Sequence, residues 1–252
     1  AASDVYKRQA KHRSIRKFRS EPIAPEVLQD MLEAASRAST CGNMQLYSLI
    51  VTQSRELREA LAPCHFNQPM VTQAPCVITV CADVHRFSMW CEQRDAEPCY
   101  DNFAWFLNGV TDALLAAQNL CVEAEAHGLG ICYLGTTIYT AEEIARILDL
   151  PKGVIPVTTI VVGHPDESPE LTDRLPLDAV VHCEKYHHYT SSEIDELWAE
   201  KETSEETRRL LEENGLPNLA QIFTRNRYRA EDNLAISRNY FALLKKQGFF
   251  NN

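Results

Sequence analysis

The sequence predicts an α+β fold, a sandwich of a β-sheet and flanking helices. Residues 76–83, CVITVCAD, form a continuous apolar and β-branched run, which is typical of a buried strand. Residues 47–52 and 157–162 have the same character. Between them, residues 108–127 carry apolar side chains at helical spacing, and Gly128 follows as a stop. A chain of 252 residues can bury these elements in one large domain.

Helical periodicity or a capping residue marks further helices. They are residues 22–38 with Pro25 in the first turn, residues 55–61 behind Ser54, and residues 192–201, 204–214 and 231–247. Residues 131–134 indicate a short strand. After this strand, Thr140 and Glu143 match the capping box of another short helix.

The apolar positions predict which helix faces are buried. In the helix at 108–127 the predicted stripe comprises Val110, Ala113, Leu114, Ala117, Leu120, Cys121 and Ala124. In the last helix we expect Leu234, Tyr240, Phe241 and Leu244 to face inward. Beyond it, Phe249 and Phe250 are apolar, and docking on a partner chain and packing on their own subunit are equally supported.

Composition narrows the classes of partner. Lys and Arg number 25 against 35 Asp and Glu, a formal charge of −10, whereas a nucleic-acid partner requires a broad basic surface. No apolar run approaches the roughly 20 residues that span a bilayer. The first residues also lack the apolar segment of a secretory signal. We therefore expect a cytoplasmic protein that binds neither nucleic acid nor membrane.

The cysteines indicate reduced thiols rather than disulfides or a metal site. Their number, nine, is odd, and no Cys-x-x-Cys pair occurs. Cys76, Cys81, Cys121 and Cys132 lie in apolar runs, where a thiol behaves as a small buried apolar group. We therefore expect no metal.

The segment His12-Arg13-Ser14-Ile15-Arg16 combines cations with a hydroxyl in an acidic chain. Such donors are typical of an anion site, and phosphate is the commonest anion. In an extended segment alternate residues face the same way, so His12, Ser14 and Arg16 would share one side. Spacing alone, however, favours the alternative of a solvated basic turn.

Other segments offer polar or flexible positions that a ligand site could use. They are residues 39–43 after the first helix, Gln68 before the strand at 76–83, Gly135 after Leu134, and Arg174 in a Pro-flanked loop. Glycine at a strand end lets the backbone approach a ligand closely. No Gly-x-Gly-x-x-Gly or Gly-x-Ser-x-Gly motif is present, which argues against a Rossmann site and an α/β-hydrolase.

Six motifs in a shared order resemble those of the nitroreductase family of FMN-dependent oxidoreductases. They are HRSIRKF, STCGNMQ, VTQAP before CVITVCAD, HGLGICYLG, GHPDESPEL with DRLP, and KKQGF, and they extend from Lys11 to Phe249. The set is most similar to the oxygen-insensitive, NADPH-dependent flavin-reductase-like subgroup. The resemblance implies a central, mostly antiparallel sheet flanked by helices in an intertwined homodimer.

The resemblance also implies a domain organisation. Residues 1–9 would be a non-native or disordered start, and residues 10–190 the FMN-binding core. Residues 191–252, in the same domain, would form a helical excursion and a tail that embraces the partner. The composition agrees, because charged helical patterns replace apolar strands from about residue 191.

At the phosphate end of FMN, the resemblance assigns contacts to cations and a hydroxyl. His12 and Ser14 would contact the phosphate and ribityl chain, with Arg13 beside them. Arg174 would bind the phosphate through its guanidinium fork. Arg16 would lie at the pyrimidine edge of the flavin, where negative charge develops on reduction.

At the ring end, the implied contacts come from other loops. Gln68 would hydrogen-bond the pyrimidine edge, and the backbone at Leu134, Gly135 and Thr136 would reach flavin N5 or O4. The ring would be lined, in this family often from the second subunit, by Ser39, Thr40, Cys41 and Asn43.

Some positions depart from the family pattern. Thr172 stands where the subgroup usually has Lys, so one phosphate cation is missing. Either FMN affinity is lower as a result, or Arg13 compensates. Thr136 replaces the second glycine of a Gly-Gly pair. Cys41 stands where Ser is common, and we expect a small substitute there rather than a redox residue.

The implied activity is transfer of two electrons from NAD(P)H to nitroaromatics, quinones or flavins by a ping-pong mechanism. The flavin rather than a catalytic side chain performs the chemistry. The other partners would be small aromatic electron acceptors. Candidates for the NADPH 2′-phosphate are Arg208, Arg225 and Arg227, with solvated surface charge as the equally supported alternative.

Two other functions remain open. One is a specialised FMN enzyme of the same superfamily, dehalogenase-like or flavin-fragmenting, with residues 86–102 as the segment that would carry a substrate-specific lid. The other is a non-catalytic FMN-binding protein, which would bind flavin without being reduced by either nucleotide.

Overall fold

The computed structural model describes residues 9–251, so the predicted start at residues 1–9 lies outside the described part except for its last residue. The chain forms two compact units. The first comprises Ala1–Glu170 and Arg238–Asn252, and the second comprises Leu171–Ser237. The first boundary thus falls before the change in composition near residue 191.

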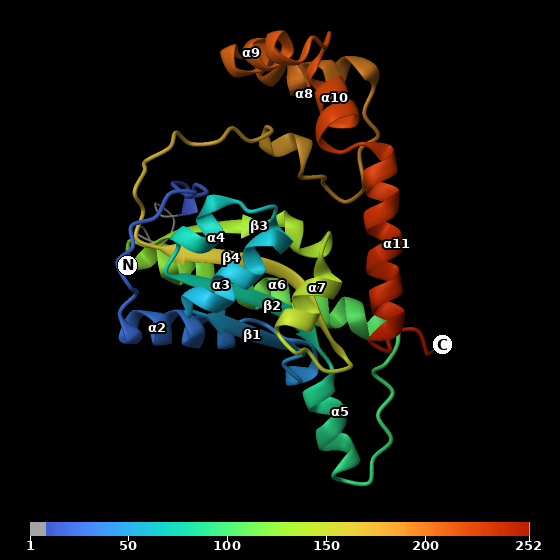
Figure 1. The fold of residues 1–252 in the computed structure, drawn as a ribbon. Coiled ribbons are helices and arrows are strands. Elements are labelled where there is room, and N and C mark those ends of the chain that lie inside the picture. The colour runs from blue at the N-terminus through green and yellow to red at the C-terminus, as the bar shows by residue number, and fades with distance from the viewer. Residues whose placement is uncertain (1–8, 252) are drawn as a thin grey trace. The chain divides into compact units, whose positions relative to one another are not determined.

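A four-stranded sheet in the order β1-β2-β4-β3 forms the centre of the first unit (Figure 1). Its strands are β1 (Tyr47–Thr52), β2 (Cys76–Asp83), β3 (Gly130–Leu134) and β4 (Val154–Gly163). Every neighbouring pair is antiparallel, which confirms the predicted α+β fold with an antiparallel sheet. The first two strands have the predicted bounds, whereas β4 is longer at both ends than predicted.

Helices cover both faces of the sheet. On one face, α2 (Pro25–Ser36) and α6 (Phe103–Ala126) pack over alternate residues of the central strands, such as Ile78. On the other face, Val77 and Val161 pack with residues of the shorter helices. Because both faces are covered, every residue of β2 is buried, which explains its continuous apolar sequence.

The shorter elements of the first unit lie between these strands and helices. They are η1 (Cys41–Asn43), α3 (Arg55–Leu61), η2 (Ala62–His65), α4 (Pro69–Gln73), α5 (His85–Glu92), η3 (Gly135–Ile138) and α7 (Ala141–Ile147). The predicted cap of α3 is confirmed, because the Ser54 side chain accepts a hydrogen bond from the Leu57 N–H. The sequence did not indicate α5, which projects away from the sheet (Figure 1).

The second unit is largely helical. It contains η4 (Leu177–Ala179), α8 (Ser191–Thr203), α9 (Glu205–Asn214), α10 (Leu219–Ile222), the π-helix η5 (Phe223–Arg227) and the start of α11 (Ala230–Lys246). Thr190 and Glu193 form a capping box at the start of α8. Gly215, with a φ of 62°, ends α9.

The predicted capping box at Thr140 is wrong. The Thr140 hydroxyl donates instead to the backbone carbonyl of Cys64 at 2.7 Å, and no side chain caps α7. Glu143 pairs with Arg146, at 2.5 Å between Oε1 and Nη2. A tertiary acceptor therefore competes successfully for the hydroxyl that the local pattern assigned to the helix.

The predicted buried faces of two helices need correction. Leu114 is 42% exposed, because it points away from the small side chains with which α6 meets the sheet. On α11, Leu234 and Phe241 are 60% and 50% exposed. Leu244 is buried as predicted, and Leu243, which was not predicted, is buried beside it.

The two aromatic residues near the end of the chain pack on their own subunit. Phe249 is fully buried, with its ring 5.5 Å from that of Phe106. Phe250 stacks at 6.1 Å from Phe103. Of the two alternatives that the sequence supported equally, packing within the subunit is therefore correct.

The four cysteines predicted to be buried are buried. Burial raises the pKa of the Cys76 and Cys121 thiols to about 12, so both stay protonated near neutral pH. No helix within residues 9–251 is both long enough and apolar enough to cross a membrane.

Candidate functional site

The basic segment near the start of the chain lies against β3, at one edge of the sheet. Ser14 forms a parallel bridge with Ile131, and the Ile15 N–H donates to the Ile131 carbonyl at 2.9 Å. Ile15 is buried, whereas Arg16 is exposed. Because the two segments run parallel, Arg16 lies further toward Gly135, the residue that follows β3.

Gly130 allows this close approach. A Cβ atom there would lie 2.6 Å from Cγ1 and 2.8 Å from Cβ of Ile15, closer than atoms can pack. We expect Gly130→Ala to lower the free energy of unfolding by about 1–3 kcal/mol, because the basic segment must move away from β3. Urea denaturation measures the change. Gly135→Ala is the control, since a Cβ there meets nothing within 4 Å, and equal losses in both variants would refute the explanation.

Three cations of the basic segment have different surroundings. His12 Nδ1 lies 2.5 Å from Oε1 of Glu125, which fixes the ring and leaves Nε2 as the nitrogen available to a ligand. Arg13 donates to the carbonyl of Pro169 at 2.7 Å. The guanidinium of Arg16 has no hydrogen-bond or ion-pair partner among residues 9–251, so it is the cation most available to an anion.

Ser14 and Arg16 also act on the thiol behind them. Burial raises the pKa of Cys132, while the positive charge of Arg16 and a hydrogen bond with Ser14 partly offset that rise. The Arg16 backbone N–H donates to Oε1 of Glu167 at 2.5 Å. The segment is therefore anchored by its backbone, while its polar side chains lie at the strand edge.

Gln68 lies at the end of a left-handed turn. Phe66 and Asn67 have φ values of 56° and 53°; asparagine adopts this region readily, whereas a bulky phenylalanine there costs roughly 1–3 kcal/mol. Backbone hydrogen bonds hold the turn, among them the Gln68 N–H to the His65 carbonyl at 3.1 Å. Strain of this kind accumulates at functional sites, where the chain must present a side chain in one direction.

His65 joins this turn to the turn that follows β3. Its ring is fully buried, and Nδ1 lies 2.8 Å from Oγ1 of Thr136. Burial lowers the pKa of the ring to about 4, so His65 is neutral at pH 7. The other ring nitrogen, Nε2, is buried without a hydrogen-bond partner among the described residues.

The polar loop between α2 and β1 is organised by a buried carboxylate. Asp112 of α6, 2% exposed, accepts hydrogen bonds from the Thr40 hydroxyl at 2.5 Å, the Cys41 N–H at 2.9 Å and the Leu46 N–H at 3.1 Å. Gly42 adopts a φ of 55° within this loop. The carboxylate therefore fixes the backbone of residues 40–46, including the predicted ring-lining positions.

One subunit does not bring all the predicted residues together. The loop at residues 39–43 precedes β1, whereas the basic segment lies on β3 at the opposite edge of the sheet. Along α6, Asp112 and Glu125 anchor these two segments 13 residues apart, or about 20 Å at the helical rise. The residues at the β3 edge, with Gln68 and Gly135, form one group, and residues 39–43 form another.

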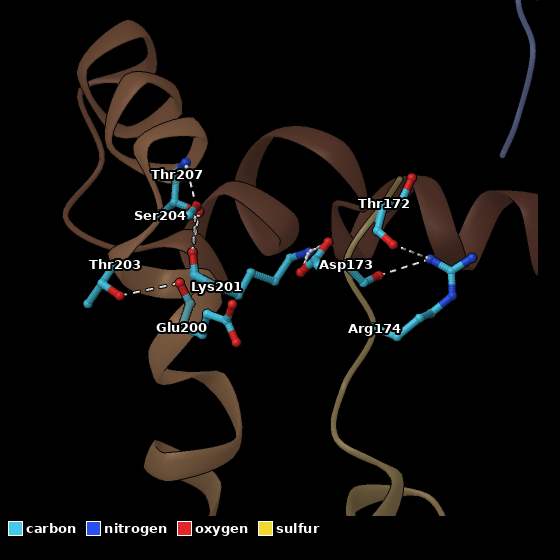
Figure 2. Close-up of polar contacts among 8 residues, drawn as sticks. All are labelled: Thr172, Asp173, Arg174, Glu200, Lys201, Thr203, Ser204 and Thr207. Carbon is cyan, nitrogen blue, oxygen red and sulfur yellow. Dashed lines mark hydrogen bonds and ion pairs between the residues drawn. The ribbon is translucent and has the colours of Figure 1, made fainter. Parts of the chain in front are cut away.

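Arg174 belongs to the second unit, where it lies beside an ion pair (Figure 2). Its Nη1 donates to the carbonyls of Asp173 at 2.9 Å and Thr172 at 3.3 Å. Lys201 of α8 binds the Asp173 carboxylate, with Nζ at 2.8 and 3.0 Å from its oxygens. Lys201 therefore offsets the negative charge of the carboxylate next to Arg174.

The arginines proposed for NADPH lie on α9 and η5 in the second unit. The guanidinium of Arg227 lies 5.5 Å above the ring of Phe223, a cation–π contact. Arg208 and Arg225 are exposed and form no ion pair with any described residue. By contrast, neighbouring Arg229 is bound by Asp232 at 2.7 Å, so it is less available to a ligand.

Sequence reasoning missed Asp112 and His65. A signal existed for Asp112, because it lies at helical spacing from Gly109 and Ala116 on the small-residue face of α6, where a carboxylate needs buried donors. Periodicity gave no signal for His65, since its burial depends on packing between η2 and η3.

The fold and site define a class of α+β proteins with an antiparallel sheet, a basic segment on one edge strand and a polar loop at the other edge. The family model described as the nitroreductase family matches residues 10–164. The chain belongs to the nitroreductase family.

Relatives agree with this assignment. An NADPH-dependent oxidoreductase of Staphylococcus aureus is 36% identical over 187 residues, 73% of this chain and 74% of its own length. A crystal structure from Bacteroides fragilis has 48% identity and a TM-score of 0.95, covering 97% of this chain and 100% of its own. NADPH:FMN oxidoreductase from Vibrio harveyi, complexed with NAD+, has 26% identity and a TM-score of 0.82, with 99% and 100% covered.

Proposed function

We propose that this chain is an FMN-dependent oxidoreductase that transfers two electrons from NAD(P)H to nitroaromatics, quinones or flavins in a ping-pong cycle. Its family, the NADPH-dependent oxidoreductase of S. aureus and the NADPH:FMN oxidoreductase of V. harveyi support the cofactor and the co-substrate. The observation that carries the proposal is the basic segment beside β3, which places exposed Arg16 further along the strand, on the side of the exposed turn at Gly135.

The residues at the β3 edge fit FMN. Its phosphate needs a cation and a hydroxyl donor, which His12 and Ser14 would supply, and its pyrimidine edge needs a cation, which Arg16 would supply from the same extended segment. Its flat ring needs a backbone that can come close, and a Cβ built at Gly135 would meet open space. Arg174 would add a guanidinium to the phosphate.

FMN, when bound, would supply the redox chemistry, namely hydride acceptance from a nicotinamide and two-electron transfer to a second substrate. The protein residues would bind and orient. His12, held by Glu125, and Ser14 would fix the phosphate end, and Arg16 would stabilise negative charge at the pyrimidine edge. Gln68, presented by its strained turn, would bond the same edge. Because the flavin would carry the chemistry, the reaction requires no catalytic acid–base pair of side chains.

We further propose a homodimer that shares its sites. The exposed leucines of α6, Leu107, Leu114 and Leu115, share one helix face and are 48, 42 and 43% exposed. An apolar face of this kind is typical of a surface covered by another subunit. A second copy would bring residues 39–43 to the β3 edge, which one subunit leaves without a ring-lining loop.

Charge on this face should prevent association. We expect Leu114→Arg to convert a dimer into a monomer, because burying an unpaired guanidinium at an apolar interface is strongly unfavourable. Light scattering measures the mass. The control is Leu177→Arg, which adds the same charge at a 75% exposed leucine of the second unit. A wild-type chain that is monomeric with full FMN occupancy would contradict the shared site.

Loss of either assigned cation should weaken FMN binding. We expect Arg16→Ala and Arg174→Ala each to remove one charge-assisted contact, roughly 1.5–3 kcal/mol, or about a 10- to 100-fold higher Kd. Quenching of flavin fluorescence during titration of FMN-free protein measures the Kd. Arg37→Ala, at an exposed arginine after α2, is the matched control. Unchanged flavin retention in both variants would refute the assigned contacts.

Anaerobic mixing of the flavin-loaded protein with NADPH or NADH tests the activity. Loss of the yellow colour with either nucleotide, followed by its return on addition of a quinone or nitroaromatic, is the expected result. No bleaching with either nucleotide would instead support the non-catalytic FMN-binding protein. Weaker bleaching by NADPH in Arg208→Ala, Arg225→Ala or Arg227→Ala would locate the 2′-phosphate contact.

One observation favours the specialised enzyme as the second candidate. The segment around α5 carries an aromatic cluster in which Tyr100 lies 5.2 Å from Phe87 and 4.7 Å from Trp105. Trp90 adjoins Phe87 at 5.4 Å and is 54% exposed. These rings could select a particular acceptor.

The cytoplasm, where thiols stay reduced, is the location we propose.

A further inference from the structure

We propose that His65 is a positioning residue that holds two turns of the flavin site, the one at Gly135 and Thr136 and the one that presents Gln68, in a fixed relation. The proposal rests on the FMN-binding function above. It assigns a role to a buried side chain that the reaction itself does not use.

Two hydrogen bonds from one residue carry the inference. The ring of His65 bonds Thr136 through Nδ1 at 2.8 Å, and its backbone carbonyl accepts the N–H of Gln68 at 3.1 Å. Thr136 is the second residue of η3, directly after Gly135. His65 therefore bonds both turns, so a shift of its ring would move one turn relative to the other.

The neighbouring contacts make this connection rigid. Thr140 donates its hydroxyl to the carbonyl of Cys64 at 2.7 Å, which adds a second link between η2 and the segment after β3. The left-handed turn at Phe66 and Asn67 follows immediately, and backbone hydrogen bonds hold it: the Phe66 N–H donates to the Pro63 carbonyl at 3.1 Å, and the Asn67 N–H donates to the Ala62 carbonyl at 2.9 Å. A displacement at Thr136 is therefore transmitted to Gln68 rather than absorbed between them.

Burial of the His65 ring is unfavourable because one of its two nitrogens has no hydrogen-bond partner among the described residues. In a neutral imidazole one nitrogen donates and the other accepts. Whichever role Nδ1 takes toward Thr136, Nε2 keeps an unsatisfied proton or lone pair among the described residues. An apolar side chain would avoid this cost, so the bond to Thr136 is the contact that explains a histidine here.

Thr136 is also a position where this chain departs from the family pattern, in which the turn carries two glycines. Glycines leave the backbone of a turn free, whereas the Thr136 hydroxyl gives His65 a group to hold. The histidine and the threonine thus form a pair: the hydroxyl fixes a turn that glycines would leave mobile.

The test uses three single variants and one double variant, with FMN affinity and hydrogen exchange as readouts. His65→Leu and Thr136→Val each remove the bond, and we expect a 10-fold or larger rise in the Kd for FMN with faster amide exchange at residues 135–138 and 66–68. His65→Asn places an amide nitrogen near the position of Nδ1, and we expect its Kd within about threefold of the parent. The double variant should lose no more than either single variant, because both share one bond.

Several results would overturn the proposal. They are additive losses in the double variant, a Kd for Thr136→Val equal to the parent, or a His65→Asn variant as damaged as His65→Leu. Thr136→Val keeps the test valid if His65→Leu does not fold. Thr72→Val, at an exposed threonine of α4, is the control.

Hydrogen exchange in the FMN-free protein separates the two proposals. If the parent binds no FMN, the proposed function fails, and the exchange rates still report whether the bond couples the turns. In the loaded protein, the hydride-transfer rate from NADPH should fall in His65→Leu while the KM for NADPH stays constant, a split that a general loss of stability would not produce.

Discussion

Replacing Asp112 by Ala is expected to lower the free energy of unfolding by about 2–4 kcal/mol. The carboxylate is buried and accepts hydrogen bonds from the Thr40 hydroxyl and from the N–H groups of Cys41 and Leu46. Alanine leaves two backbone donors without an acceptor in a region that water does not reach, and each such donor costs about 1–3 kcal/mol. Urea denaturation monitored by circular dichroism measures the change.

The loss should extend from stability to flavin binding. Without Asp112 the loop at residues 40–46 is no longer fixed, and its ring-lining residues would lose their place in the proposed shared site. Asp112→Asn keeps one carbonyl acceptor and should lose less. Asp195→Ala, at an exposed carboxylate of α8, is the surface control. An Asp112→Ala variant as stable as that control would contradict the role of the carboxylate.

Acid should destabilise the protein through His65. Burial lowers the pKa of the folded-state ring from 6.5 to about 4. Below pH 6.5 His65 binds a proton in the unfolded chain but stays neutral in the folded chain, so a fall in pH favours unfolding. The stabilisation is complete above pH 6.5 and is lost as pH falls toward 4. A shift from 6.5 to about 4 corresponds to about 3 kcal/mol.

The difference between two proteins isolates this effect. Denaturation midpoints of the parent and of His65→Asn, measured between pH 7 and about pH 4, contain the same contributions from all other groups. Because asparagine does not titrate, the stability of the parent relative to the variant should decline by about 3 kcal/mol over that range. Parallel pH profiles would show that the buried ring is not neutral in the folded protein.

The strands and the long helices could be predicted because their signals are local. A continuous apolar run gave β2 its bounds, and helical spacing located α6. The start of α6 was predicted late, because the capping residue, Asn102, comes before a turn of aromatic residues that do not show the periodicity. Its side chain accepts a hydrogen bond from the Trp105 N–H at 3.3 Å.

Predictions failed where a distant group competes with a local pattern. The local pattern predicted that the Thr140 hydroxyl would cap α7, but this hydroxyl donates to the carbonyl of Cys64 instead. On α11 the apolar residues outnumber the positions that the first unit can cover, so Phe241 stays exposed while Leu243 is buried. Spacing in one helix cannot reveal which of its apolar residues meets a partner.

In the candidate site, too, features with a local signal could be predicted and features that depend on distant contacts could not. The basic segment and Gly135 were identified from their residue types and order, and the structure brings them to one edge strand. The groups that hold the basic segment, the loop at residues 40–46 and the turn after β3 in place are Glu125, Asp112 and His65, polar residues inside helices and turns with no motif of their own. Their side chains bond partners that lie 66 or more residues away in the chain, which no local pattern encodes.

The first unit is formed by two separate stretches of chain, and this governs how the protein responds to a protease. Gln247 donates to the carbonyl of Val154 at 3.0 Å, Tyr240 donates to that of Pro156 at 3.0 Å, and Phe249 is fully buried. A single cut within Leu171–Ser237 therefore breaks the covalent chain without releasing either fragment. The nicked protein should migrate as one folded species, and its two pieces should separate only when denaturant removes the contacts of the last helix.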